Sequence, residues 1–184
     1  MIDVRKIIRE AIEDYISQDE GIRAVLFDFD MTLFDTTCLV GIDQELIRST
    51  NDISSISHLI NKVKIYDGID EMLSYLRNHN IAYGIVSNRN EAIIKAVVGK
   101  YGLKPQIIVG ERLNCPKGIR MKEALRKLAV EPKNALYVGD STSDNAEARK
   151  SGIDFVGASW GGKTLPMAYN SPSELIKYIE YINS

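Results

Sequence analysis

Residues 24–32 read AVLFDFDMT, and this stretch indicates the fold of the chain more directly than any other. Residues 24–29 form a short, nearly continuous apolar run, which is typical of a strand covered on both faces of a sheet. Asp28 and Asp30 lie two residues apart, so on an extended chain their carboxylates project in the same direction. Adjacent carboxylates repel each other unless one is protonated or a cation lies between them. A hard divalent cation with oxygen ligands would resolve this conflict.

Two other interpretations of the acidic pair compete with a metal site. The Asp-x-Asp spacing also occurs at the start of calcium-binding loops, but such a loop needs glycine at its sixth position and glutamate at its twelfth. The chain has Leu33 and Leu39 at those positions, which excludes a calcium loop. A polar turn that simply closes the strand stays open as an alternative, although buried carboxylates need partners.

Further apolar runs alternate with helical patterns along the rest of the chain. The apolar runs cover residues 81–86, 106–109, 135–138 and 155–158, and the helical patterns cover about 69–79, 90–101, 118–129 and 142–151. A final helix is expected after Ser171, with Pro172 at its first position and Glu174 closing a capping box. Strands that alternate with helices predict an α/β fold: a doubly wound, mostly parallel sheet with helices on both faces.

Residues 36–66 interrupt this alternation directly after the first core strand. Four apolar residues in this interval have helical spacing and predict one helix: Ile53, Ile56, Ile60 and Val63. A shorter helix is expected near residues 43–50. We therefore expect a core domain from residues 1–35 and 67–184 and a small helical cap inserted between them. Such a cap would lie over the carboxyl ends of the strands, where open α/β sheets bind ligands.

An amphipathic helix is expected at residues 2–18. Its apolar stripe consists of Val4, Ile7, Ile8, Ala11, Ile12, Tyr15 and Ile16. An apolar face of this length must be covered. It could dock on the flank of the core sheet or form a two-fold contact between chains, so we expect a monomer or a homodimer.

Two further strand ends carry groups that are suited to bind phosphate. Ser87 and Asn88 precede a helix whose N-cap is expected at Asn90, and a hydroxyl with free backbone N–H groups at a helix N-terminus forms a phosphate cradle. A serine in this place also serves as a plain cap. Lys117 precedes another helix, where its ammonium group could neutralise a phosphoryl oxygen and a nearby carboxylate. A single lysine is otherwise an ordinary surface charge.

The run at 135–138 is followed by the sequence GDSTSD at residues 139–144. Asp140 falls at the carboxyl end of the strand. Asp144 lies four residues further on, in the first turn of the next helix, so both side chains can face one site. The alternative is a plain helix cap made by Asp140 or Ser141.

In this order, the four motifs resemble those of the haloacid dehalogenase superfamily of phosphohydrolases: Asp28-x-Asp30-x-Thr32, Ser87-Asn88, Lys117, and Gly139-Asp140-x-x-x-Asp144. The resemblance covers roughly residues 24–162, and it is greatest to members of the phosphoglycolate phosphatase type. It implies a magnesium-dependent phosphatase that acts on a small phosphorylated metabolite through an aspartyl-phosphate.

The resemblance also implies a role for each matching residue. Asp28 would be the covalent nucleophile, and Asp30 would be the general acid and then the general base. Magnesium would be held by the Asp28 carboxylate, the Asp30 backbone carbonyl, Asp140 and, directly or through water, Asp144. The phosphoryl oxygens would be held by Thr32, Ser87, Asn88 and Lys117.

The chain departs from the family pattern in two places. The third motif reads Pro116-Lys117-Gly118 instead of the usual Lys-Pro pairing, which leaves Lys122 as a second candidate for its lysine. The expected cap is about half as long as in relatives of the phosphoglycolate type, so their substrate does not transfer to this chain.

Other function classes share part of this pattern. A phosphomutase or phosphotransferase would form the same aspartyl-phosphate and would differ in how well the cap excludes water. A receiver-like signalling module uses similar residues, but its phosphorylated aspartate follows the third strand. A dehalogenase proper needs neither a magnesium cluster nor Asp30.

The composition restricts partners and compartment. A net charge of −2 gives no overall attraction to nucleic acid or to anionic membranes. Cys38 and Cys115 match neither a disulfide framework nor a zinc site. Charges within the first twenty residues argue against a signal peptide, and no apolar stretch approaches the roughly 18 residues that span a bilayer. We therefore expect a cytoplasmic protein with a small phosphorylated substrate and no nucleic-acid or membrane partner.

Overall fold

Six strands form the central sheet, and each neighbouring pair is parallel. The computed structural model describes residues 21–42, 47, 52–165 and 168–184. The strands, in sheet order, are β5 (Ile107–Val109), β4 (Ala82–Val86), β1 (Ala24–Phe27), β6 (Ala135–Gly139), β7 (Asp154–Ala158) and β8 (Ala168–Tyr169). The strands that follow β1 in the chain are added first on one side of it (β4 and β5) and then on the other (β6, β7 and β8). This reversal of strand order makes β1 the switch point of a doubly wound fold. This order differs from that of flavodoxin-like sheets, the arrangement of a receiver module.

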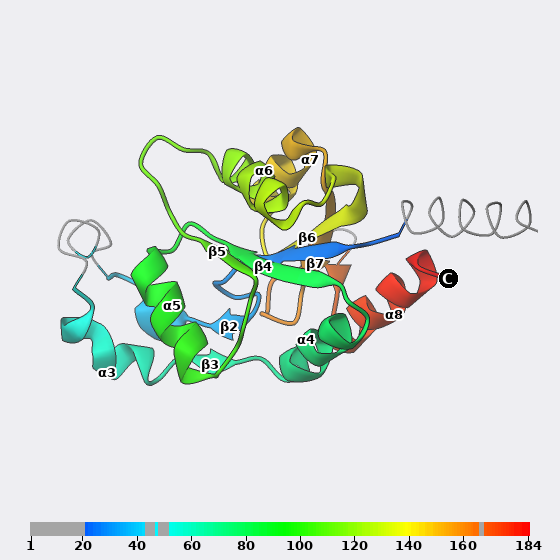
Figure 1. The fold of residues 1–184 in the computed structure, drawn as a ribbon. Coiled ribbons are helices and arrows are strands. Elements are labelled where there is room, and N and C mark those ends of the chain that lie inside the picture. Colours follow the sequence, from blue (N-terminus) through cyan, green and yellow to red (C-terminus); the bar gives the residue numbers. More distant parts are fainter. Residues whose placement is uncertain (1–20, 43–46, 48–51, 166–167) are drawn as a thin grey trace, which may run out of the picture.

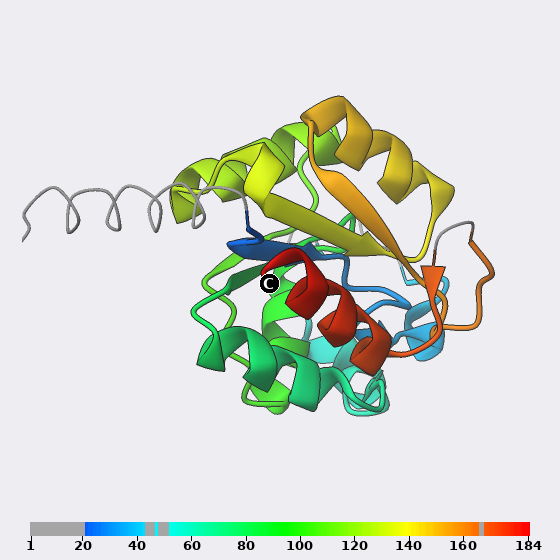
Figure 2. The same ribbon diagram turned by 90° about the vertical axis from the view of Figure 1, so that its right-hand side faces the viewer.

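Helices cover both faces of this sheet, as the sequence predicts (Figures 1 and 2). One face carries α4 (Ile69–Asn78), α5 (Glu91–Lys100) and α8 (Pro172–Ile182), and the other carries α6 (Lys117–Leu128) and α7 (Thr142–Ser151). Because successive side chains of a strand point to opposite faces, β1 contributes to two cores. Val25 and Phe27 belong to one hydrophobic cluster, whereas Ala24 and Leu26 belong to the other. The expected fold class is confirmed.

The segment expected to form a cap is built differently from the prediction. In place of one helix spanning Ile53 to Val63, it has a 3-10 turn at Ser54–Ile56 and a single α-turn, α3 (Ser57–Ile60). The Asp52 carboxylate accepts the backbone N–H of Ser54 at 2.8 Å. Such local hydrogen bonds between a side chain and the backbone compete with the hydrogen bonds of a regular α-helix. The apolar residues are nevertheless buried: Ile56, Ile60 and Val63 are at most 9% exposed.

A small two-stranded sheet joins the two ends of this segment. Strand β2 (Phe34–Asp35) pairs antiparallel with β3 (Lys64–Ile65), and a 3-10 turn at Thr37–Leu39 follows β2. Strands of two residues leave no periodicity in the sequence, so β2, β3 and β8 were not predictable from pattern. The helix expected at 2–18 lies outside the described residues. So does the one near 43–50, except for Ile47, which is buried.

The last helix begins where predicted but without the predicted capping box. Ser171 is the N-cap and Pro172 the first residue of α8, yet the Ser171 hydroxyl lies 2.9 Å from that of Ser173. Glu174 accepts the backbone N–H of Asn170 at 2.8 Å instead of that of Ser171. Both cysteines are free thiols. Among the described residues, no helix has the length and apolar character needed to cross a bilayer.

Candidate active site

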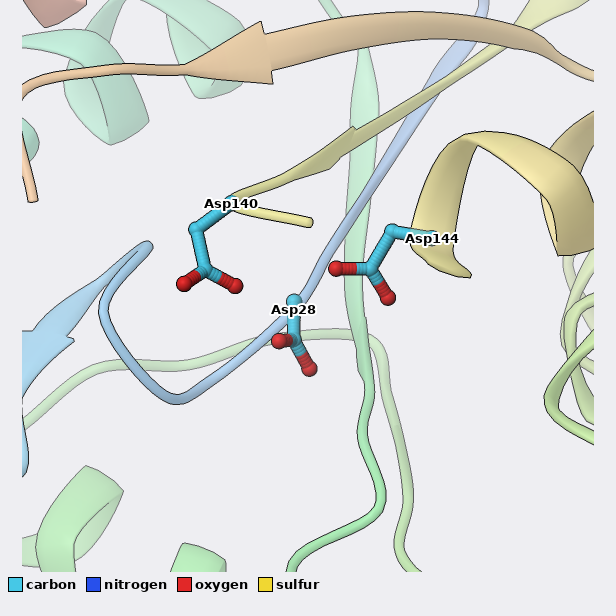
Figure 3. A group of neighbouring side chains, drawn as sticks. All are labelled: Asp28, Asp140 and Asp144. Atoms are coloured by element: carbon cyan, nitrogen blue, oxygen red, sulfur yellow. The ribbon is translucent and has the colours of Figure 1, made fainter. Parts of the chain in front are cut away.

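Three buried carboxylates meet at the carboxyl edge of the sheet (Figure 3). Asp28 follows β1, Asp140 follows β6, and Asp144 lies in the first turn of α7. One carboxylate oxygen from each lies within 4.8 Å of the others, and each residue is at most 5% exposed. The backbone N–H of Asp28 donates to Val138 at 2.8 Å, which fixes the two strand ends relative to each other. We call Asp28, Asp140 and Asp144 the acidic cluster.

The cap of α7 explains how Asp144 comes to face the cluster. Ser141 is the N-cap, and its hydroxyl accepts the backbone N–H of Asp144 at 3.1 Å. The same hydroxyl lies 2.6 Å from the Asp144 carboxylate, to which it donates. Because Ser141 satisfies the helix terminus, Asp140 is not used as a cap. Asp140 is instead paired with Lys163, whose side chain is 56% exposed.

Lys117 is the cation that lies inside the cluster. Its Nζ donates to Asp28 Oδ1 at 3.0 Å and to Asp144 Oδ1 at 2.6 Å, and its side chain is 6% exposed. Lys122, the second candidate for this role, is exposed and lines a shallow groove with Glu147 and Lys150. The structure therefore brings Lys117, and not Lys122, to the acidic cluster.

The electrostatic balance of the cluster favours an added cation. Burial raises the pKa of Asp28 to about 6; Lys117 opposes this rise, and the charges of Asp144 and Asp30 add to it. Burial alone would lower the pKa of Lys117, but Asp28 and Asp144 outweigh it, so this pKa lies above its ordinary value. Lys117 and Lys163 are the two lysines paired with the three carboxylates, so the cluster keeps a net negative charge when all three are ionised. Carboxylate oxygens are the ligands that magnesium prefers, so the donor set fits that ion.

Thr32 places a buried hydroxyl beside the turn that follows β1. The residue is fully buried, and its Oγ1 has no hydrogen-bond partner among the described residues. Its carbonyl is held by Trp160, whose Nε1 donates to it at 2.7 Å. A buried hydroxyl left without a partner costs about 1–3 kcal/mol. A bound anion with acceptor oxygens would remove that cost.

A buried residue that the sequence analysis missed forms hydrogen bonds with the loop after β4. Arg120, in α6, is 2% exposed and donates to the carbonyls of Ser87 and Gly110. It also donates to the side-chain oxygen of Asn88. Ser87 is buried, whereas Asn88 is exposed at the end of the strand. Arg120 lies three residues after Lys117, on the same face of the helix, and this spacing is the one signal that could have indicated it.

Asp30 lies outside the acidic cluster and has a separate partner. Its carboxylate forms an ion pair with Arg89, at 2.7 Å from Nη2, and its backbone bridges to Phe34. The Arg89 side chain is only 12% exposed. Trp160 and the adjacent Gly161 pack against the turn at residues 31–32. A Cβ on Gly161 would lie 2.1 Å from the Met31 carbonyl, so glycine is required there.

Curated proteins with similar sequences include phosphoglycolate phosphatases. The enzyme of Xylella fastidiosa strain 9a5c is 30% identical over 103 residues, which cover 53% of this chain and 45% of that protein. The enzyme of Rhodospirillum rubrum is 31% identical over 109 residues, covering 56% and 45%. The matched part of the chain thus spans about half the length of these relatives.

Solved structures show the same fold. A haloacid dehalogenase superfamily hydrolase from Geobacter sulfurreducens superposes with a TM-score of 0.70 at 20% identity, covering 86% of this chain and all of that one. One from Ehrlichia chaffeensis gives 0.67 at 21% identity, covering 90% and 99%. The model of the haloacid dehalogenase-like hydrolase family matches residues 40–158, which include Ser87, Lys117 and both Asp140 and Asp144. The chain belongs to the haloacid dehalogenase-like hydrolase family.

Proposed function

We propose that this protein is a magnesium-dependent phosphomonoester hydrolase that works through an aspartyl-phosphate on Asp28. The observation that carries the proposal is the acidic cluster, which is buried together with Lys117. Membership of the family and the names of the curated relatives support the same reaction class. The substrate would be a small phosphorylated metabolite.

The two catalytic residues would act in two steps. In the first, a carboxylate oxygen of Asp28 attacks phosphorus, the bond from phosphorus to the ester oxygen breaks, and Asp30 gives its proton to the leaving oxygen. In the second, Asp30 takes a proton from water, and the resulting hydroxide attacks the phosphorus. This step breaks the aspartyl–phosphate bond and regenerates the Asp28 carboxylate and the proton on Asp30.

The remaining site residues would bind the phosphoryl group and neutralise its negative charge. Lys117, whose Nζ contacts Asp28, would neutralise a phosphoryl oxygen, and the hydroxyls of Thr32 and Ser87 and the amide of Asn88 would donate hydrogen bonds to the other oxygens. Magnesium would be held by the three carboxylates of the acidic cluster and by the backbone carbonyl of Asp30. When bound, it would neutralise negative charge on the phosphoryl oxygens. Lys163 would have to leave Asp140 for that carboxylate to bind the ion.

A hydrolysis screen over phosphorylated metabolites tests this function. Phosphate release should require magnesium and stop in excess chelator. Asp28→Asn should keep the fold but lose turnover by more than about 10³-fold, because an amide cannot form the acyl phosphate. Wild-type protein with beryllium fluoride should carry the phosphate mimic on Asp28. Turnover of Asp28→Asn within tenfold of wild type, with the fold intact, would exclude Asp28 as the nucleophile.

A further inference from the structure

We propose that Arg89 is a positioning residue that holds the carboxylate of Asp30 in its catalytic orientation and ties it to the first turn of the cap. This inference rests on the proposed function and goes beyond it by giving a role to a residue outside the four motifs of the sequence analysis. Arg89 directly follows the Ser87-Asn88 loop, and its side chain crosses to the turn after β1.

The contact between the two side chains is made at more than one point. Arg89 Nε lies 3.1 Å from Asp30 Oδ1 and 3.2 Å from Oδ2, and Nη2 lies 2.7 Å from Oδ1. A planar guanidinium that meets both oxygens of a carboxylate fixes its direction as well as its distance. The backbone of Asp30 is held separately by its bridge to Phe34. Together these contacts leave the carboxylate little rotational freedom.

Three further polar contacts hold Arg89 in place. Its backbone N–H donates to Ser87 Oγ at 3.2 Å, and its carbonyl accepts the N–H of Glu111 at 2.9 Å. Its Nη1 lies 3.5 Å from the carbonyl of Leu39, in the 3-10 turn that opens the cap. One side chain therefore connects the loop after β4, the turn after β1 and the start of the cap. A change in the cap at Leu39 would be transmitted to Asp30 through this residue.

The same geometry argues against Arg89 as a direct anchor for substrate. Two of its three nitrogens already face Asp30, so binding a substrate anion would cost that ion pair. Its side chain is 12% exposed, compared with 26% for Asp30. Arg89 is thus placed to act through Asp30, and its loss should lower kcat more than it raises KM.

A double-mutant cycle with p-nitrophenyl phosphate as the substrate tests the assignment. Arg89→Met should lower kcat by roughly 10- to 100-fold with KM changed less than about twofold, because a small misplacement of a catalytic group costs rates of that order. In an Asp30→Asn background the same substitution should lower kcat by less than about threefold, since the carboxylate that Arg89 positions is already absent. Arg89→Lys, which keeps the charge but not the two-point contact, should fall between Arg89→Met and wild type.

A matched control separates this role from the loss of any arginine–carboxylate pair. Arg112 meets Glu123 through two nitrogens, at 2.5 and 3.0 Å, and its side chain is 44% exposed. Arg112→Met should leave kcat and KM unchanged. Thermal melts monitor folding, and if Arg89→Met does not fold, the cycle is run with Arg89→Lys.

The outcomes distinguish the inference from the function on which it rests. Suppose that wild-type protein hydrolyses the ester. If the decreases in kcat from the Arg89 and Asp30 substitutions are additive, or if Arg89→Met raises KM instead of lowering kcat, the positioning role is wrong and the proposed function stands. If wild-type protein releases no phosphate with magnesium from any ester, the proposed function fails, and this inference fails with it.

Discussion

Two aspartates that are neighbours in sequence have different surroundings. Asp28 lies in the acidic cluster against Lys117, whereas Asp30 is paired with Arg89. Asp140 lies 112 residues after Asp28 in the sequence, yet it shares the acidic cluster with Asp28, whereas Asp30 does not. Metal binding and proton transfer should therefore be separable by substitution.

Asp30→Asn should leave magnesium affinity within about threefold of wild type, because the ligand expected from this residue is its backbone carbonyl. Its hydrolysis should fall by roughly 10²–10⁴-fold, the range for general acid–base catalysis. Asp140→Asn should instead weaken magnesium binding, since it removes one of three carboxylates. Calorimetric titration with magnesium measures affinity in both variants. Loss of binding in Asp30→Asn and full binding in Asp140→Asn would reverse the two roles.

The raised pKa of Asp28 predicts a pH-dependent stability in magnesium-free protein. Burial raises this pKa from 3.8 to about 6, so the native carboxyl keeps its proton over a range where the unfolded chain has lost it. The contribution of Asp28 to stability is therefore full below about pH 4 and is lost as the pH rises through about 6. The melting temperature of Asp28→Asn relative to wild type should increase across that interval in chelator. If this difference in melting temperature stayed constant or decreased, burial would not be destabilising the ionised form of Asp28.

At the level of elements, the position of Lys117 depends on how closely α6 approaches α7. Gly118, the next residue, makes this approach possible. A Cβ there would lie 2.7 Å from the Ser151 hydroxyl and 3.0 Å from the Glu147 carbonyl, both in α7. The backbone N–H of Gly118 also donates to the Glu147 carboxylate at 2.9 Å. The two helices are thus fixed to each other next to the lysine that enters the acidic cluster.

Gly118→Ala should destabilise the protein by about 1–3 kcal/mol, the usual cost of overpacking, and should lower the hydrolysis rate by moving Lys117. Gly99→Ala is the matched control, because Gly99 lies in α5 with nothing within 4 Å of the added Cβ. That substitution should stabilise the protein by up to about 1 kcal/mol through helix propensity. Urea unfolding measures both changes. A neutral Gly118→Ala would mean that α6 and α7 have room to separate.

Over the whole molecule, a small insertion follows the first core strand and contacts the carboxyl edge of the sheet at Leu39. The ends of this insertion are tied together by β2 and β3, and its described part contains only short helical turns. The start of the insertion contacts the core site through Leu39 and Arg89. We infer that a cap of this size leaves the site partly open to solvent.

An open site should accept generic aryl esters, so the kcat/KM for p-nitrophenyl phosphate should lie within about 10²-fold of the best metabolite in the screen. Water should also remain the main acceptor, because transfer to another alcohol requires its exclusion. Adding glycerol as a competing acceptor and comparing p-nitrophenol with free phosphate measures both properties. A large excess of p-nitrophenol over phosphate would instead favour the phosphotransferase alternative.

The fold class and the edge of the sheet that carries the chemistry followed from local sequence patterns. The core helices and strands lie within about two residues of the predicted ranges, because apolar periodicity reports directly on which faces are buried. Parallel strands end at one edge, so Asp28, Ser87 and Asp140 had to lie near one another once the sheet was predicted.

Only the tertiary structure decided which cation meets which carboxylate. Lys117 reaches Asp28 across 89 residues of sequence, and Arg89 reaches Asp30 across 59. Arg120 lies on the buried face of α6, but only the packing of α6 against the loop after β4 shows that it donates to the carbonyls of Ser87 and Gly110. Charged side chains are long and carry no periodic signal, so their partners depend on how distant segments pack. Sequence patterns determine which surfaces are buried, whereas the pairing of charges at the site is set by that packing.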